Sequence, residues 1–289
     1  MTKRSIIGIS IFLFLIVTIG VLFGAVFCLR TQNVKIVGDS PILPTKEKII
    51  EIANFKKGKS IFMLDKETAT NNIEMAYPYV KVIQIKTTSI SSIDIIVRAR
   101  HEMYYTEFNE SYYILDEDLK VLKINSPIED TPAEMPNLVH IEDGALNITT
   151  ETKICDFVGN EYQTTVAYEL YNSMINTVTK VEGDGEDAKK VYLNRDDVVD
   201  MIKYVDFENF QTFNKIIITT KHGVKLDIEA PNKELQNKIN ICFSTIDFFL
   251  NSEKAETKEK ATKGTIKIHY DLQGNQKCAY IPEDDLVSE

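Results

Sequence analysis

A near match to a phosphate-binding loop lies at residues 53–60, where Gly58, Lys59 and Ser60 stand in the order that holds phosphate groups. The full pattern requires glycine at the position of Ala53, a strand before the loop and a helix after it. Here a helical pattern comes first and an extended segment follows. We therefore interpret the lysines as part of a solvated turn, and the sequence does not favour nucleotide binding.

Two other kinds of stretch resemble binding motifs only in outline. Gly183, Gly185 and Ala188 have the spacing of a dinucleotide fingerprint, but they follow a helical pattern and alternate with acids that would repel a pyrophosphate. The aspartates at positions 116, 118, 196, 197 and 200 lack the spacing of a calcium loop and a partner for acid-base catalysis. We interpret all of them as solvated acidic loops and turns.

Histidine and cysteine are too dispersed to predict a metal site. The histidines at positions 101, 140, 222 and 269 lack ligand spacing. Beyond Cys28, the cysteines are Cys155, Cys242 and Cys278, and none belongs to a C-x-x-C pair. We interpret them as isolated small apolar side chains, and one disulfide among the three stays open. No group of residues combines a nucleophile with a base, so the sequence predicts a non-enzymatic protein without cofactor or metal.

The chain begins with a long apolar segment. No charged residue occurs from Ser5 to Leu29, and this run would form a helix about 37 Å long, enough to cross a hydrocarbon core of about 30 Å. It is longer than the core of a signal peptide and lacks a small-x-small cleavage site, so we expect an anchor rather than the leader of a secreted protein. Lys3 and Arg4 place residues 1–4 in the cytoplasm. The sequence thus predicts a single-pass, type II protein of the cell membrane.

The part of the chain beyond the predicted span carries an excess of acid. All 43 acidic residues lie there, together with 31 of the 33 basic residues. A net-acidic surface argues against nucleic acid, and against anionic lipid head groups, as main partners.

Residues 33–100 have the pattern of a small module of strands and helices. A first alternating run ends at Gly38. Thr45 and Asp65 each stand where a helix would be capped, and Pro78 ends the second helix. Two alternating runs follow, so the predicted order is β-α-α-β-β.

Residues 101–281 are predicted to form a mixed β domain with two packing helices. Apolar residues recur every three or four positions over 161–181 and 232–250, which predicts one buried face on each helix. Residues 251–263 between alternating runs are expected to form a loop. Alternating tyrosines in the hairpin over 103–115 indicate packing or recognition, and both interpretations stay open. The predicted fold class is therefore α+β, with an acidic tail at 282–289.

The first segment resembles the POTRA domain of the FtsQ/DivIB bacterial cell-division proteins, through Val34–Gly38, Lys57–Asp65, Tyr77–Val80 and the strand that ends near Arg100. The later segment resembles the β domain of the same family, through the hairpin at Gly223, the helix with Lys233–Lys238, and Gly264–Tyr270. One departure lies after the third strand of the first module. There the family usually has Glu-Arg-x-Pro, and this chain keeps only Arg100.

The resemblance implies a bitopic scaffold of the divisome at the division septum. Such a scaffold holds small bitopic division proteins of the FtsB/DivIC and FtsL types outside the membrane during septum formation. The alternative is a POTRA-type extracytoplasmic assembly or secretion chaperone, whose partners would be secreted clients.

The resemblance also implies a place for the partner. In the family, the small partner adds a strand at the C-terminal edge of the β domain, where exposed amides and carbonyls can pair. The corresponding contact residues here are Ile266, Ile268, Tyr270 and Tyr280. The two tyrosines could equally serve only to cover the sheet, so both interpretations stay open.

Overall fold

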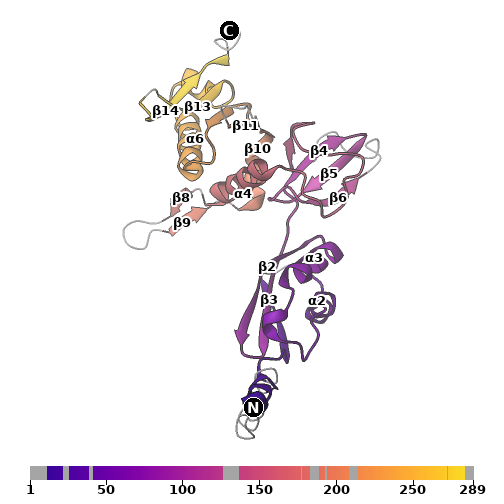
Figure 1. Ribbon diagram of the computed structural model, residues 1–289. Helices are drawn as coiled ribbons and strands as arrows, with labels where there is room; N and C mark the ends of the chain where they lie inside the picture. Colours follow the sequence, from indigo (N-terminus) through magenta and orange to yellow (C-terminus); the bar gives the residue numbers. More distant parts are fainter. Residues whose placement is uncertain are drawn as a thin grey trace. The chain divides into compact units, whose positions relative to one another are not determined.

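The chain divides into two compact units, Met1–Arg100 and His101–Glu289. Each combines helices with β-sheet, which confirms the predicted α+β class (Figure 1). The glycine-rich acidic stretch at 183–188 and most of the acidic tail lie outside the described residues. The computed structural model describes residues 12–21, 26–38, 42–125, 137–176, 178–182, 189–192, 194–207, 214–271 and 273–283.

The first unit contains a three-stranded sheet and two α-helices. Its elements are β1 (Thr31–Val37), α2 (Lys46–Ala53), the short 3-10 helix η1 (Ile61–Met63), α3 (Lys66–Ala76), β2 (Val80–Ser89) and β3 (Ser92–Ala99). β3 is the central strand, parallel to β1 and antiparallel to β2. The core joins both helices to the sheet through the fully buried side chains of Ile49, Ile73, Ile93, Ile95 and Val97.

The two helices of the first unit begin with different geometry. Asp65 caps α3, as predicted, by accepting a hydrogen bond from the backbone N–H of Thr68 at 3.0 Å, and this bond lowers the pKa of Asp65. Thr45 occupies the N-cap of α2, but its side chain makes no capping hydrogen bond, so the predicted cap was wrong. At the other end of α2, Asn54 adopts a left-handed conformation with φ of 51°, which is a common way to end a helix.

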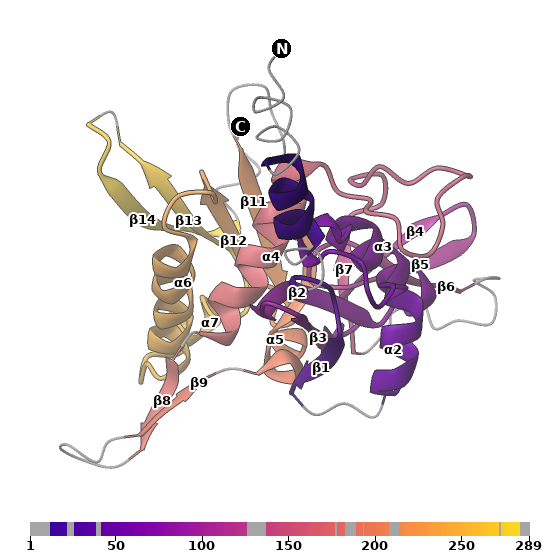
Figure 2. The same ribbon diagram turned by 60° about the horizontal axis from the view of Figure 1, so that its bottom comes forward.

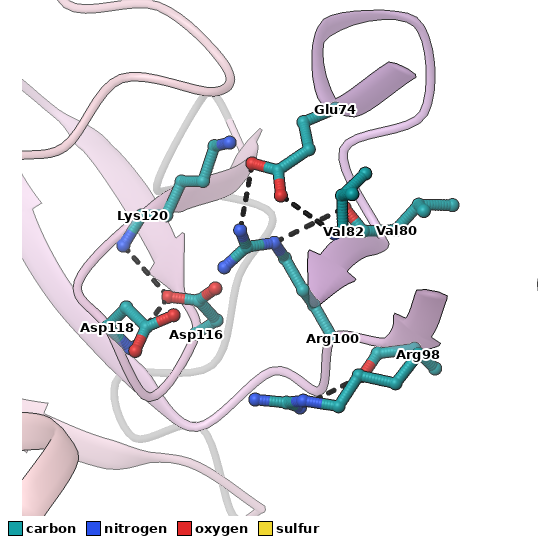
Figure 3. A network of polar contacts seen from close by, with 9 residues as sticks. Glu74, Val80, Val82, Arg98, Arg100, Asp116, Asp118 and Lys120 are labelled. Atoms are coloured by element: carbon teal, nitrogen blue, oxygen red, sulfur yellow. Dashed lines mark hydrogen bonds and ion pairs between the residues drawn. The ribbon is translucent and has the colours of Figure 1, made fainter. Parts of the chain in front are cut away.

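A buried ion pair joins α3 to the sheet (Figure 3). The guanidinium of Arg100 donates to the Glu74 carboxylate at 3.0 Å and to the carbonyl of Val80 at 3.4 Å. The second carboxylate oxygen of Glu74 accepts from the backbone N–H of Val82 at 2.9 Å. Charges withdrawn from water need such pairing, because an isolated buried charge is strongly unfavourable. Arg100, the residue retained from the resembled motif, therefore holds α3 against β2.

The predicted membrane span lies partly outside the described residues. Residues 12–21 are helical, and no helix within the described part of the chain is long and apolar enough to cross a membrane. The predicted end of the span was wrong, because Leu29 is fully buried in the core of the first unit. Its backbone N–H donates to the carbonyl of Lys59 at 2.8 Å, and the N–H of Ile61 donates to the carbonyl of Phe27 at 2.9 Å. Hydropathy cannot distinguish a leucine buried in protein from one buried in lipid.

The second unit is built on a nine-stranded mixed sheet (Figure 2). In order across the sheet, the strands are β14 (Gln276–Ile281), β13 (Thr265–Tyr270), β12 (Lys225–Glu229), β11 (Lys215–Thr220), β10 (Ile202–Asp206), β7 (Val139–Ile141), β4 (Tyr104–Phe108), β5 (Ser111–Leu115) and β6 (Val121–Asn125). A separate two-stranded sheet consists of β8 (Val178–Glu182) and β9 (Lys189–Tyr192). The helices are α4 (Glu161–Ile175), α5 (Arg195–Met201), α6 (Leu235–Leu250) and α7 (Ala255–Glu259).

The core of the second unit forms where α4 and α6 pack with the sheet. Asn160 and Gln163 begin α4 with a reciprocal capping box, which satisfies two backbone donors at the start of the helix. Both helices then present the apolar stripe that the sequence predicted. The buried side chains include Val166, Leu170 and Met174 of α4, Ile239, Phe243 and Ile246 of α6, and Ile216, Ile218, Leu226, Ile228, Ile266 and Ile268 of the sheet.

Parts of the second unit differ from the prediction. The helix expected over 161–181 ends at Ile175, and the β-branched residues that follow belong to β8. The loop expected over 251–263 contains α7. β7, at 139–141, was not predicted, because three residues carry no periodic signal. Parallel pairing with β4 and β10 defines this strand.

The interpretation of Asp116 as part of a solvated turn was wrong. This residue is fully buried, and one carboxylate oxygen accepts from the backbone N–H groups of Asp118 and Lys120, each at 2.9 Å. Asp197 also has a structural role, because it completes a capping box with Asn194 at the start of α5. These carboxylates organise backbone turns and helix ends.

Candidate partner-binding edge

The large sheet has a free edge at β14. This strand pairs antiparallel with β13, from Ile281 opposite Thr265 to Gln276 opposite Tyr270. Within the described residues, no strand pairs with the outer side of β14. The backbone groups on that side are therefore placed to pair with an added strand.

The opposite edge, at β6, is partly covered. The backbone N–H of Val121 donates to the carbonyl of Asp156 at 2.9 Å, and the N–H of Cys155 donates to the carbonyl of Val121 at 2.8 Å. Lys120 and Phe157 also form an isolated antiparallel bridge. Because the loop with Cys155, Asp156 and Phe157 already occupies the beginning of β6, β14 is the more accessible edge for a partner strand.

Two of the four predicted contact residues lie in the interior of the sheet. Ile266 and Ile268 are fully buried on β13. β13 is paired on one side with β12 and on the other with β14, so an added strand would not reach it. The structure therefore places these two side chains in the core beneath the edge rather than on its surface.

Tyr280 attaches β14 to the rest of the unit. The centroid of its ring lies 5.3 Å from that of Phe249, and the ammonium of Lys260 lies 5.2 Å from the same ring. Its hydroxyl donates to the carbonyl of Lys263 at 3.0 Å. Gly264, at φ of 85°, makes room for this contact, since a Cβ there would lie 2.6 Å from the hydroxyl oxygen. The half-buried Tyr280 thus has a structural role, whether or not it also contacts a partner.

Tyr270 covers a buried lysine. The fully buried Lys238 of α6 donates from its Nζ to the carbonyls of Glu229 and Ala230, each at 2.7 Å. The same ammonium lies 4.9 Å from the centroid of the Tyr270 ring. Burial lowers the pKa of Lys238 to about 8. The predicted site residue is therefore part of a cation-π contact at the end of β13.

α6 lies beside β13 and β14 in both views (Figure 1 and Figure 2). Cys242, one turn after Lys238, is fully buried, and burial raises the pKa of its thiol. No disulfide joins the four cysteines, which all lie in the described part of the chain, and Cys278 of β14 is exposed. Near the end of the same helix, Phe248 is 67% exposed beside the buried Phe249. Phe248 is thus an exposed apolar side chain beside Phe249, which packs against Tyr280 of the edge strand.

Sequence reasoning did not single out Lys238, Phe249 and Lys260. The helical periodicity of α6 contained a signal for Phe249, but the predicted stripe ended on its neighbour Leu250. In the structure Phe249 is buried and Leu250 is 45% exposed. A difference of one residue rotates a side chain by about 100° around a helix, since a turn contains about 3.6 residues. The contacts of Lys238 with Tyr270 and of Lys260 with Tyr280 join each lysine to a strand distant in sequence and left no local pattern.

Part of the chain is similar to bacterial cell division proteins. It is 37% identical over 82 residues to the cell division protein DivIB of Clostridium acetobutylicum, which is 28% of this chain and 32% of that protein. It is 33% identical over 85 residues to DivIB of Clostridium tetani, again 32% of that protein and 29% of this chain. The matched region spans about a third of the length of these curated relatives.

Other comparisons add no second functional class. An uncharacterised protein of Caenorhabditis elegans is 24% identical over an alignment of 140 residues that covers 41% of this chain and 14% of that protein. No family model matches the chain. The relatives whose names carry a function are thus cell division proteins.

Proposed function

We propose that this protein is a non-enzymatic, single-pass membrane scaffold of the bacterial division machinery. In this proposal, residues 5–26 form the core of the anchor, the first unit is a POTRA domain and the second is an FtsQ/DivIB-type β domain. The protein acts at the septum, where it holds small bitopic proteins of the FtsB/DivIC and FtsL types outside the membrane. The similarity to two DivIB cell division proteins is the observation that carries the proposal.

The free edge at β14 supports a specific binding mode. A strand of the partner would extend the nine-stranded sheet by pairing with the outer side of β14. Main-chain hydrogen bonds would supply affinity, and alternate side chains would supply specificity. Phe248, exposed at the end of α6, offers an apolar contact for residues of the partner beyond that strand.

Proline substitutions in β14 test this mode. Successive residues of a strand direct their backbone N–H groups to opposite sides, so one of Cys278 and Ala279 points toward β13 and the other points outward. Proline removes the N–H and is tolerated in strands mainly where that group faces solvent. We expect Cys278→Pro and Ala279→Pro to behave differently: one lowers the melting temperature, and the other keeps it but loses co-purification of the DivIC-type partner.

Alanine substitutions at the same two positions are the matched controls, since they retain the N–H. Both should fold and bind like the wild type. Full partner binding by the proline variant that keeps its melting temperature would exclude strand addition at β14. A fluorescent fusion tests the cellular role separately: midcell recruitment at constriction supports a divisome scaffold, whereas co-purification of secreted clients without such recruitment supports the assembly-chaperone alternative.

A further inference from the structure

Three exposed apolar side chains of the first unit lie at one end of its sheet. β2 ends and β3 begins at this end, and the turn between them carries Ile90, which is 56% exposed. The adjacent helix η1 presents Phe62 at 72% and Met63 at 81% exposure. We call Phe62, Met63 and Ile90, together with the exposed Lys57 and Lys59, the proximal rim.

The chain enters the first unit at the proximal rim. The carbonyl of Phe27 accepts from the N–H of Ile61 at 2.9 Å, and the ring centroids of Phe27 and Phe62 lie 5.4 Å apart. On the other side of the chain, the N–H of Arg30 donates to the carbonyl of Ser91 at 2.8 Å, next to Ile90. η1 and the β2–β3 turn are thus both bonded to residues 27–30, where the uncharged apolar run ends.

The charge of the proximal rim differs from that of the chain as a whole. The turn with Lys57 and Lys59 is fixed to Leu29, because the N–H of Gly58 donates to the Leu29 carbonyl at 2.9 Å and the N–H of Leu29 donates back to the turn. The next acid along the chain, Asp65, accepts hydrogen bonds from the N–H and the hydroxyl of Thr68. Two exposed ammonium groups therefore flank the apolar side chains, despite the acidic excess of the whole protein.

We propose that the proximal rim docks on the membrane surface that the apolar run enters. Phe62, Met63 and Ile90 lie in the interfacial layer, and Lys57 and Lys59 contact anionic head groups. This combination of large apolar side chains with lysines is what binds a protein surface to the boundary between head groups and acyl chains. The inference rests on the membrane anchoring in the proposed function, because only that anchoring brings the rim to a bilayer. Docking restricts rotation of the first unit about its anchor.

Tryptophan fluorescence tests the docking directly, since the chain has no tryptophan of its own. The full chain carrying Phe62→Trp is reconstituted in phosphatidylcholine vesicles, with or without phosphatidylglycerol. The vesicles contain lipid with brominated acyl chains, which quenches tryptophan fluorescence. We expect blue-shifted, quenched emission that is stronger with phosphatidylglycerol. The matched control is Met75→Trp on α3, 71% exposed and next to Glu74, whose partner Arg100 lies beyond the other end of β3. Its emission should stay unquenched.

Charge reversal tests the lysines. Lys57→Glu with Lys59→Glu, in the Phe62→Trp chain, should remove the increase in quenching that phosphatidylglycerol causes, and added salt should weaken that increase in the parent. Lys46→Glu with Lys48→Glu, on exposed positions of α2, is the matched control and should leave it intact.

Vesicle flotation separates this inference from the anchoring on which it rests. A Phe62→Trp chain that floats with vesicles but stays unquenched in both lipid mixtures overturns the docking and leaves the anchor standing. A chain that does not float overturns the anchor and the docking together. Equal quenching of the Phe62→Trp and Met75→Trp chains also overturns the proposal, because the rim would then have no special place at the membrane.

Discussion

Lys238 should make the stability of the second unit rise with pH between about 7 and 9. Burial lowers its pKa from 10.5 to about 8. Since one pKa unit corresponds to about 1.4 kcal/mol, burial disfavours the charged lysine by about 3 kcal/mol. Below pH 8 both the folded and the unfolded chain hold the proton, so this unfavourable contribution is fully present. As pH rises from 8 toward 10.5, the folded lysine releases its proton first, and stability increases.

The expected gain follows from these two pKa values. Between pH 7 and pH 9 the linkage relation gives about 1.3 kcal/mol of added stability from this lysine. Cys242 acts in the opposite direction, since its pKa is raised from 9.0 and its unfolded thiol ionises first, but it contributes only about 0.4 kcal/mol of loss at pH 9. The net change remains positive.

Lys238→Met isolates this contribution. Urea unfolding of a fragment with residues 101–283, followed by circular dichroism at pH 7, 8 and 9, measures the free energy of unfolding. The difference between wild type and Lys238→Met should change by about 1.3 kcal/mol in favour of the wild type from pH 7 to pH 9. A difference that stays constant would refute the reasoning, and would mean that the two carbonyls and the Tyr270 ring stabilise the ammonium enough to cancel its desolvation.

Three further predictions concern buried and capping groups. Arg100→Met should destabilise the first unit by about 3–5 kcal/mol in thermal unfolding, because Glu74 becomes an uncompensated buried charge, and adding Glu74→Gln should recover part of the loss. Asp116→Ala should lower the free energy of unfolding of the second unit by at least about 2 kcal/mol, since two backbone donors lose their acceptor; an effect near zero would show that water replaces the carboxylate. Asp65→Ala should lower the melting temperature of the first unit, whereas Thr45→Ala should leave it unchanged, because only Asp65 makes a capping hydrogen bond.

Periodic local patterns in the sequence were sufficient to predict much of the fold. The alternation in β1 and β13, the cap at Asp65 and the apolar stripes of α4 and α6 all reflect side-chain directions that repeat along a strand or helix. These signals predicted the element order of the first unit and the two packing helices of the second. They also located the C-terminal strands, whose edge became the candidate site.

Only the tertiary structure decided which residues the edge exposes. Ile268 and Cys278 face each other across β13 and β14, yet one is fully buried and the other exposed, because only β13 has strands on both sides. Leu29 belongs to the core of the first unit, although its sequence context is that of a membrane segment. As a lysine on a helix, Lys238 would be predicted to lie on the surface, but it is buried against two carbonyls and an aromatic ring that lie outside its helix. Burial depends on the partners that distant segments supply, and no local pattern encodes those partners.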